Sequence, residues 1–84
     1  MSSVSNIDDV IATALEEATE GYLSSGSVSE TDNLLERGLT SHQIVQWMLA
    51  IEEALDIEFT DSQLNKETFR SMESVRQAIQ SLSD

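Results

Sequence analysis

Residues 36–55 read ERGLTSHQIVQWMLAIEEAL, and this stretch decides the fold. Its apolar residues recur at steps of four, three and four residues, which is the spacing of one face of an α-helix. Gly38 ends the preceding segment, and Thr40 and Gln43 have the spacing of a capping box. The stretch therefore predicts a long apolar helix that begins at Thr40 or Ser41. Its stripe consists of Ile44, Met48, Ile51 and Leu55, widened by Val45, Trp47 and Leu49.

Upstream of this helix, residues 6–22 carry a second apolar stripe at helical spacing, which predicts an amphipathic helix. Ser5 or Asn6 is the expected cap, and Asp8 and Asp9 in the first turn suit the positive end of the helix dipole. The stripe consists of Ile7, Ile11, Leu15, Ala18 and Tyr22.

Between these helices, residues 21–38 hold all three glycines of the chain and many hydroxyl side chains. We expect a long connection here, with Leu34 and Leu35 as its apolar anchor. A connection of this length is uncommon in a compact domain and is often functional or mobile. A short turn of helix is expected at residues 32–37.

Downstream of the long helix, Ile57 and Phe59 alternate in an extended segment that is expected to plug the core. Thr60 or Asp61 then caps a short helical turn that ends at Leu64.

Residues 71–82 predict the last helix, with Ser71 as its cap. Its apolar face consists of Met72, Val75, Ile79 and Leu82. The prediction is an all-α fold, a small four-helix bundle with three main helices, one short helix and a long first loop. With 84 residues and 9.3 kDa, the chain is expected to form a single domain over residues 1–84.

The composition excludes several classes of function. The chain has no cysteine, so it can form neither a disulfide nor a thiolate metal site. Sixteen acidic against four basic residues give a formal net charge of -12, which disfavours nucleic acid and anionic lipid as partners and keeps a small protein monomeric. The start MSSVSNIDDV lacks the features of an export signal, and no apolar run is long enough to span a membrane. We expect a cytoplasmic monomer.

Autonomous catalysis is not expected. Ser41 and His42 are neighbours on a helix, so their side chains point about 100° apart and cannot form a catalytic dyad. One histidine and scattered carboxylates match neither a zinc site nor a calcium loop.

The chain resembles an acyl carrier protein over nearly its whole length. The resemblance is strongest in LLERGLTSHQIVQWMLAIEEALDIEFTDSQL, which is similar to the family's Gly-x-Asp-Ser-Leu, apolar helix, Glu-Glu pair and Ile-Glu exit. The ending TFRSMESVRQAI also matches the usual entry into the family's last helix. The resemblance implies a carrier protein of the same four-helix fold.

By this resemblance, Ser41 bears 4'-phosphopantetheine, which a phosphopantetheinyl transferase transfers from coenzyme A and whose thiol holds a cargo as a thioester. A helix N-terminus suits the phosphodiester, because free N–H groups and the dipole stabilise an anion there. The alternative interpretation is that Ser41 is a plain N-cap in an acidic helical interaction module that carries no prosthetic group. Thr40 can supply the cap instead, which would leave Ser41 free.

The resemblance also implies that partner enzymes dock on the second helix with basic residues facing its acids. These partners are acyl- or aminoacyl-loading ligases or synthases. The docking residues carried over are His42, Val45, Leu49, Glu52 and Glu53. The alternatives are core packing for Val45 and Leu49 and a solvated helix face for the glutamates.

Two features depart from the family pattern. Thr40-Ser41-His42 stands where Asp-Ser-Leu is usual, and it looks closer to specialised carriers, including those loaded with amino acids by stand-alone ligases. Gln43 and Gln46 stand where members of the family often carry acidic residues.

Trp47 is expected in the core, where it would fill the space that a long acyl chain needs and so favour a short or polar cargo.

Overall fold

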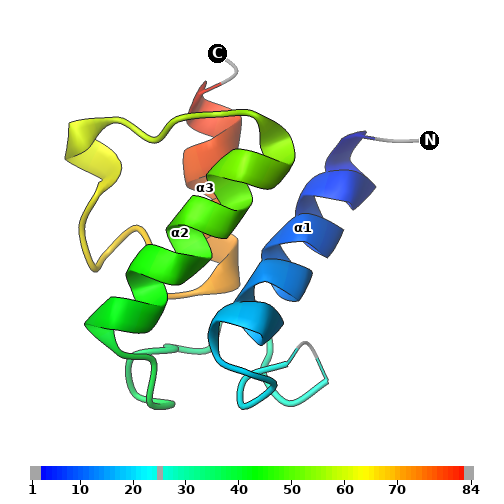
Figure 1. Cartoon of the computed structure of the whole chain (residues 1–84), viewed down its shortest axis with the longest axis vertical. Helices are drawn as coiled ribbons and strands as arrows, with labels where there is room; N and C mark the ends of the chain where they lie inside the picture. Colours follow the sequence, from blue (N-terminus) through cyan, green and yellow to red (C-terminus); the bar gives the residue numbers. More distant parts are fainter. Residues whose placement is uncertain (1–2, 25, 83–84) are drawn as a thin grey trace.

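The computed structural model, which describes residues 3–24 and 26–82, places three α-helices around one hydrophobic core (Figure 1). The helices are α1 (Ser3–Ala18), α2 (Ser41–Leu55) and α3 (Met72–Leu82), and the 3-10 turn η1 (Asp61–Gln63) lies between α2 and α3. Within residues 3–24 and 26–82 no strand is present. The predicted all-α bundle is confirmed, and its short helix is a single 3-10 turn.

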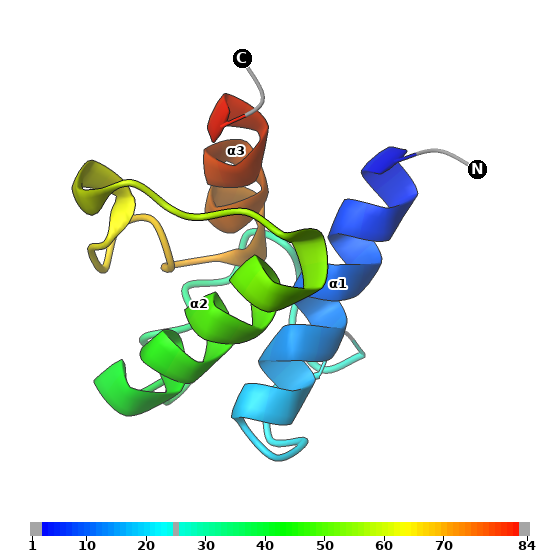
Figure 2. The same cartoon turned by 45° about the horizontal axis from the view of Figure 1, so that its top comes forward.

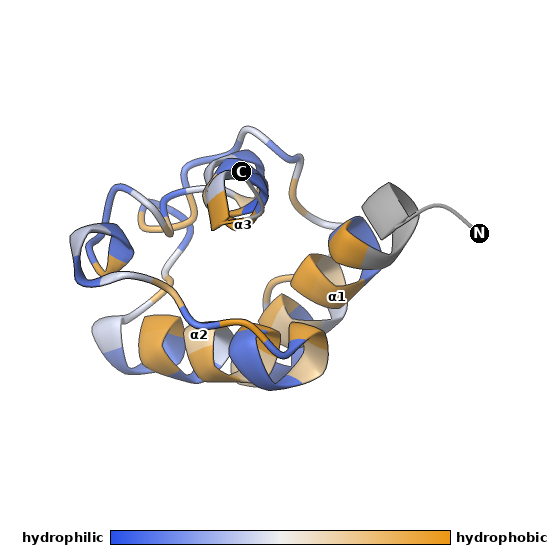
Figure 3. Ribbon diagram, turned by 90° about the horizontal axis from the view of Figure 1, so that it is seen from above, coloured by the Kyte–Doolittle hydropathy of each residue, from blue (hydrophilic) through white to orange (hydrophobic). Residues whose placement is uncertain are grey.

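The core lies where α1 meets α2 and α3. Helices α1 and α2 run side by side (Figures 1 and 2), and from above α3 lies across the interior from α2 (Figure 3). Trp47 is fully buried, and its indole Nε1 donates a hydrogen bond to the Ile11 carbonyl of α1 at 3.1 Å. The Phe69 ring packs edge-on against Trp47 and Phe59, with centroids 5.9 and 5.4 Å away. The core positions predicted for Trp47 and Phe59 are confirmed.

Helix α1 is shifted toward the N-terminus relative to the prediction. It begins at Ser3, upstream of the predicted caps Ser5 and Asn6, and its first turn contains no acidic residue. It ends at Ala18 because Glu20 and Gly21 adopt positive φ angles of 53° and 85°. Tyr22 is therefore not part of the helix stripe and is 69% exposed.

Buried leucines fix the end of the long connection that leads into α2. Leu34 and Leu39 are almost fully buried, and the Leu39 amide donates to the Leu34 carbonyl at 3.0 Å. The predicted anchor is confirmed for Leu34, whereas Leu35 is only half-buried. Residues 33–38 form consecutive turns with bonds between residues three apart, so the helical turn expected at 32–37 is not a regular helix. The anchor places Thr40 at the surface, directly before α2.

An arginine of α3 also holds this connection. The Arg76 guanidinium forms ion pairs with Glu30 in the loop and with Asp8 of α1, the latter at 3.3 Å. The hydrogen bonds that Arg76 donates to Glu30 and, second in effect, to Asp8 raise the pKa of Arg76 above its ordinary value. Asp8, which was expected to complement the helix dipole, therefore links α1 to α3 instead.

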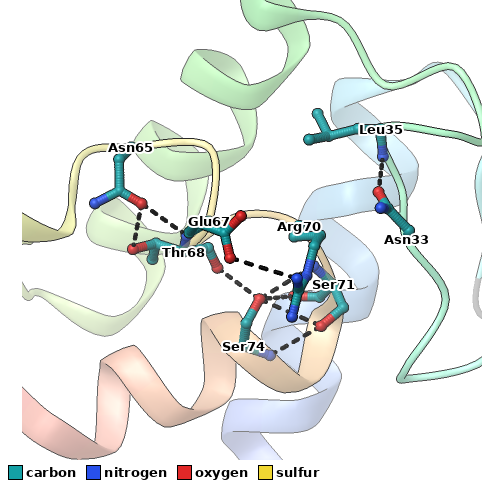
Figure 4. A network of polar contacts seen from close by, with 8 residues as sticks. All are labelled: Asn33, Leu35, Asn65, Glu67, Thr68, Arg70, Ser71 and Ser74. Atoms are coloured by element: carbon teal, nitrogen blue, oxygen red, sulfur yellow. Dashed lines mark hydrogen bonds and ion pairs between the residues drawn. The ribbon is translucent and has the colours of Figure 1, made fainter.

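The segment from η1 to α3 is irregular but well hydrogen-bonded (Figure 4). Asn65 Oδ1 accepts from the Thr68 amide at 2.9 Å. Ser71 Oγ accepts from the Ser74 amide at 3.1 Å, which confirms Ser71 as the cap of α3. The Ser74 hydroxyl reaches the Thr68 carbonyl at 2.7 Å. These bonds hold Phe69 against the core and fix the chain that precedes it.

Candidate functional site

Ser41 is the first residue of α2 and is exposed. The capping box expected from the sequence is present, and Thr40 is its N-cap. Thr40 Oγ1 accepts from the Gln43 amide at 3.1 Å, while Gln43 Oε1 accepts from the Thr40 amide at 3.0 Å. Among the residues that the structure describes, none forms a hydrogen bond with the Ser41 hydroxyl. The interpretation of Ser41 as the N-cap is therefore wrong.

A groove of about 300 Å³ begins beside Ser41 and runs between α2 and the segment that follows η1. Its walls are mainly apolar and include Ile44, Met48, Leu64 and Phe69. Sequence patterns did not reveal Leu64, Lys66 or Phe69 as part of this site, because the segment lacks helical or strand periodicity. Only the tertiary fold brings them to the start of α2.

Four of the residues expected at a docking surface share one face of α2. His42, Val45, Leu49 and Glu53 follow at helical steps of three, four and four residues and are all exposed. Val45 and Leu49 are 48% and 53% exposed, so the alternative that they pack in the core is wrong. We call His42, Val45, Leu49 and Glu53 the exposed face of α2. Two accessible apolar side chains beside a free serine provide a surface suited to a partner protein.

Glu52 differs from the other residues expected at the docking surface. It is half-buried, and its Oε2 accepts a hydrogen bond from the Phe59 amide at 2.9 Å. The next residue along, Glu53, is exposed. The acids at the end of α2 oppose its dipole, and the structure gives Glu52 a compensating role: it satisfies a backbone donor of the extended segment.

The helix end that carries Ser41 is less acidic than the chain as a whole. The first turn of α2 contains no acidic residue. Free N–H groups at this end of the helix are available to an anion attached to Ser41. The exposed hydroxyl, the complete cap beside it and the lack of an acid in the first turn of α2 all fit the attachment of a phosphodiester.

Other chemistries find no support in the described part of the chain. Neither Ser41 nor His42 has a partner there that would make it a catalytic pair, and no group of three or more metal-ligating side chains occurs between residues 3 and 24 or 26 and 82. None of the helices seen there has the length and apolar character needed to cross a membrane.

Residues 7–75 match the family model described as "Phosphopantetheine attachment site". The chain is also 38% identical over 58 residues to an aminoacyl carrier protein of Agrobacterium fabrum (strain C58 / ATCC 33970). That alignment covers 69% of this chain and 70% of the relative.

The fold is similar to a chain in the crystal structure of the Bradyrhizobium japonicum glycine:[carrier protein] ligase, complexed with its cognate carrier protein and an analogue of glycyl adenylate. The TM-score is 0.77, with 24% sequence identity. The match covers 89% of this chain and 96% of the other, and it shows likeness of fold alone.

Proposed function

Because the chain belongs to the phosphopantetheine attachment family of acyl and aminoacyl carrier proteins, we propose that it is a discrete carrier whose 4'-phosphopantetheine is attached to Ser41. It acts as a single domain over residues 1–84 and is not itself an enzyme. Its expected setting is the cytoplasm, where it works as a monomer.

The observation that carries the proposal is the separation of roles between Thr40 and Ser41. Thr40 completes the cap of α2, so Ser41 can lose its hydroxyl proton to a modification without costing the helix its cap. The hydroxyl is exposed and therefore accessible to a phosphopantetheinyl transferase that uses coenzyme A. The bound group would supply a terminal thiol, absent from this cysteine-free chain, that holds a cargo as a thioester.

The filled interior of this carrier favours a small, polar cargo that stays outside the core. Trp47 fills the centre of the bundle with no exposed surface, and its indole is held by the Ile11 carbonyl. A long acyl chain could enter the bundle only by displacing this ring, which is costly in a close-packed core. The relative from Agrobacterium is named an aminoacyl carrier protein, and this supports an aminoacyl cargo.

The expected loading partner is a stand-alone aminoacyl ligase. The crystal structure that contains the chain of similar fold also contains a ligase for glycine. We therefore take the same class of enzyme as the candidate partner here. We propose that it docks on the exposed face of α2, with apolar contacts to Val45 and Leu49 and a basic residue facing Glu53. His42 lies at the end of this face nearest the attached arm. Glu52 contributes less, because its carboxylate is already engaged with the Phe59 amide.

The attachment is tested by the intact mass of the protein after incubation with coenzyme A and a broad-specificity phosphopantetheinyl transferase. Wild type should gain one phosphopantetheine and Ser41→Ala none. Ser62→Ala, which removes another exposed hydroxyl, is the matched control and should load like wild type. If wild type gained no phosphopantetheine with several transferases, the result would favour the alternative of an interaction module without a prosthetic group.

The size of the cargo is tested through the fluorescence of Trp47, the only tryptophan of the chain. Aminoacyl and long-chain acyl forms should both leave the emission of the unloaded protein unchanged, because neither cargo enters the core. A shifted emission together with raised thermal stability in the long-chain form would contradict the proposal of a small cargo.

A further inference from the structure

Lys66 and Ser41 line the same groove, although they lie in different parts of the chain. The segment that carries Lys66 follows η1 and passes beside the first turns of α2 (Figures 1 and 2). Both residues are exposed, and the groove that they share is also lined by apolar side chains such as Ile44 and Phe69. An anion attached at Ser41 would therefore share this groove with the Lys66 ammonium group.

Lys66 is the one lysine of the chain, and the three arginines already have carboxylate partners. These pairs are Arg37 with Asp32, Arg70 with Glu67, and Arg76 with Asp8 and Glu30. Among the described residues, no carboxylate lies within 4.0 Å of the Lys66 nitrogen. The acid next to it in the chain, Glu67, pairs with Arg70 at 3.4 Å instead. Within residues 3–24 and 26–82, Lys66 is thus the one lysine or arginine side chain that forms no ion pair with a carboxylate.

The backbone on either side of Lys66 is held in place. Asn65 accepts a hydrogen bond from the Thr68 amide, and Phe69 packs against Trp47 and Phe59 in the core. The base of the Lys66 side chain is consequently fixed beside the groove, while its flexible stem can adjust the position of the charge. A fixed base reduces the entropy that an ion pair costs.

We propose that Lys66 is a positioning residue, whose ammonium group pairs with the phosphodiester on Ser41 and draws the start of the arm into the groove. The proposal rests on the attachment at Ser41. Lysine binds phosphate as a compact point charge, and a phosphodiester remains anionic at neutral pH. On a chain with a net charge of -12, this cation also offsets the repulsion that a further negative charge would meet.

The direct test uses wild-type protein labelled with carbon-13 at lysine. One Cε resonance is expected because the chain has one lysine. Attaching phosphopantetheine should shift the Lys66 Cε signal and reduce its motion, and high salt should reverse both effects because salt screens exposed charges. An unchanged Cε signal in protein whose intact mass shows full loading would overturn the role of Lys66 and leave the attachment intact. Failure to load at all would instead overturn both proposals.

Variants extend the test to the arm itself, observed through phosphorus-31 relaxation of the phosphodiester in loaded protein. Lys66→Gln should let the phosphorus relax more like that of free coenzyme A, and Lys66→Arg should behave like wild type. Arg70→Gln removes a nearby exposed cation that is already paired with Glu67, and it should also match wild type. Equal relaxation in Lys66→Gln and wild type would contradict the proposal. An equal effect of Arg70→Gln would point to general charge screening instead.

Discussion

Thr40 and Gln43 exchange two hydrogen bonds across the first turn of α2, each side chain accepting from the other residue's backbone amide. Ser41 stands between them and takes no part in this exchange. The cap of the helix and the reactive hydroxyl are thus provided by two neighbouring residues, and their roles can be separated by mutation.

Thr40→Ala should lower the free energy of unfolding by about 0.5–2 kcal/mol, because α2 loses its N-cap. Ser41→Ala should change it by less than about 0.5 kcal/mol, since that exposed hydroxyl has no structural role. Urea denaturation of the two unloaded variants measures the difference. A cost for Ser41→Ala equal to that for Thr40→Ala would mean that Ser41 caps the helix.

Substitutions of Glu52 and Glu53 should have different effects, the first on stability and the second on partner binding. Glu52→Ala leaves the Phe59 amide without its acceptor and should cost about 1–3 kcal/mol in unfolding free energy. Glu53→Ala should leave stability nearly unchanged and weaken binding to the loading ligase, most strongly at low salt. Denaturation and binding measured on both variants check this. Ligase binding that is indifferent to Glu53 at low salt would remove Glu53 from the docking surface.

Gly38 should not tolerate a side chain. Its φ angle is +104°, a conformation that residues with a Cβ rarely adopt, whereas the 3.4 Å from an added Cβ to Cε2 of the Tyr22 ring is an ordinary contact. Gly38→Ala is therefore expected to cost about 1–3 kcal/mol. Gly26→Ala is the matched control, because a Cβ at Gly26 meets nothing within 4 Å, and it should be close to neutral. Thermal unfolding of the two variants measures the difference. Equal losses of stability in both would contradict this account.

Asp32 should make the long connection sensitive to acid. The hydrogen bond from the Ser29 amide, with a further contribution from Arg37, lowers the pKa of Asp32 below its ordinary 3.8. A lowered pKa in the folded state means that the carboxylate stabilises the loop fully above pH 3.8 and loses this effect as the pH falls through the folded value.

Hydrogen exchange at the Ser29 amide measures this effect. Protection in wild type should fall on acidification below pH 3.8, whereas Asp32→Asn should show weaker protection with little dependence on pH over the same range. If protection of the Ser29 amide fell equally on acidification in both proteins, the loss would be due to another carboxylate.

The sequence predicted most accurately the features that depend on neighbouring residues. The capping box of Thr40 and Gln43 and the cap at Ser71 are each set within one turn of helix, and both are confirmed. The burial of Trp47 followed from its place on an apolar stripe. The predicted end of α1, Tyr22, was four residues beyond the observed end, Ala18. Tyr22 is apolar and at helical spacing, and nothing in this pattern indicated that Glu20 would adopt a positive φ angle.

Contacts between distant segments could not be predicted in this way. Glu52 and Glu53 look equivalent in the sequence, yet only Glu52 lies within reach of the Phe59 amide once the extended segment folds back. Lys66 likewise gave no signal, because its position beside Ser41 depends on how the chain after η1 packs on α2.

The central claim is that Ser41 bears the prosthetic group, and tandem mass spectrometry of the loaded protein tests it most directly. Trypsin releases residues 38–66, which contain the hydroxyls of Thr40, Ser41, Thr60 and Ser62. Backbone fragmentation on either side of Ser41 should place one phosphopantetheine on that residue. Its location on Thr40 or on any other hydroxyl, or unmodified peptide after exposure to active transferases, would contradict the account.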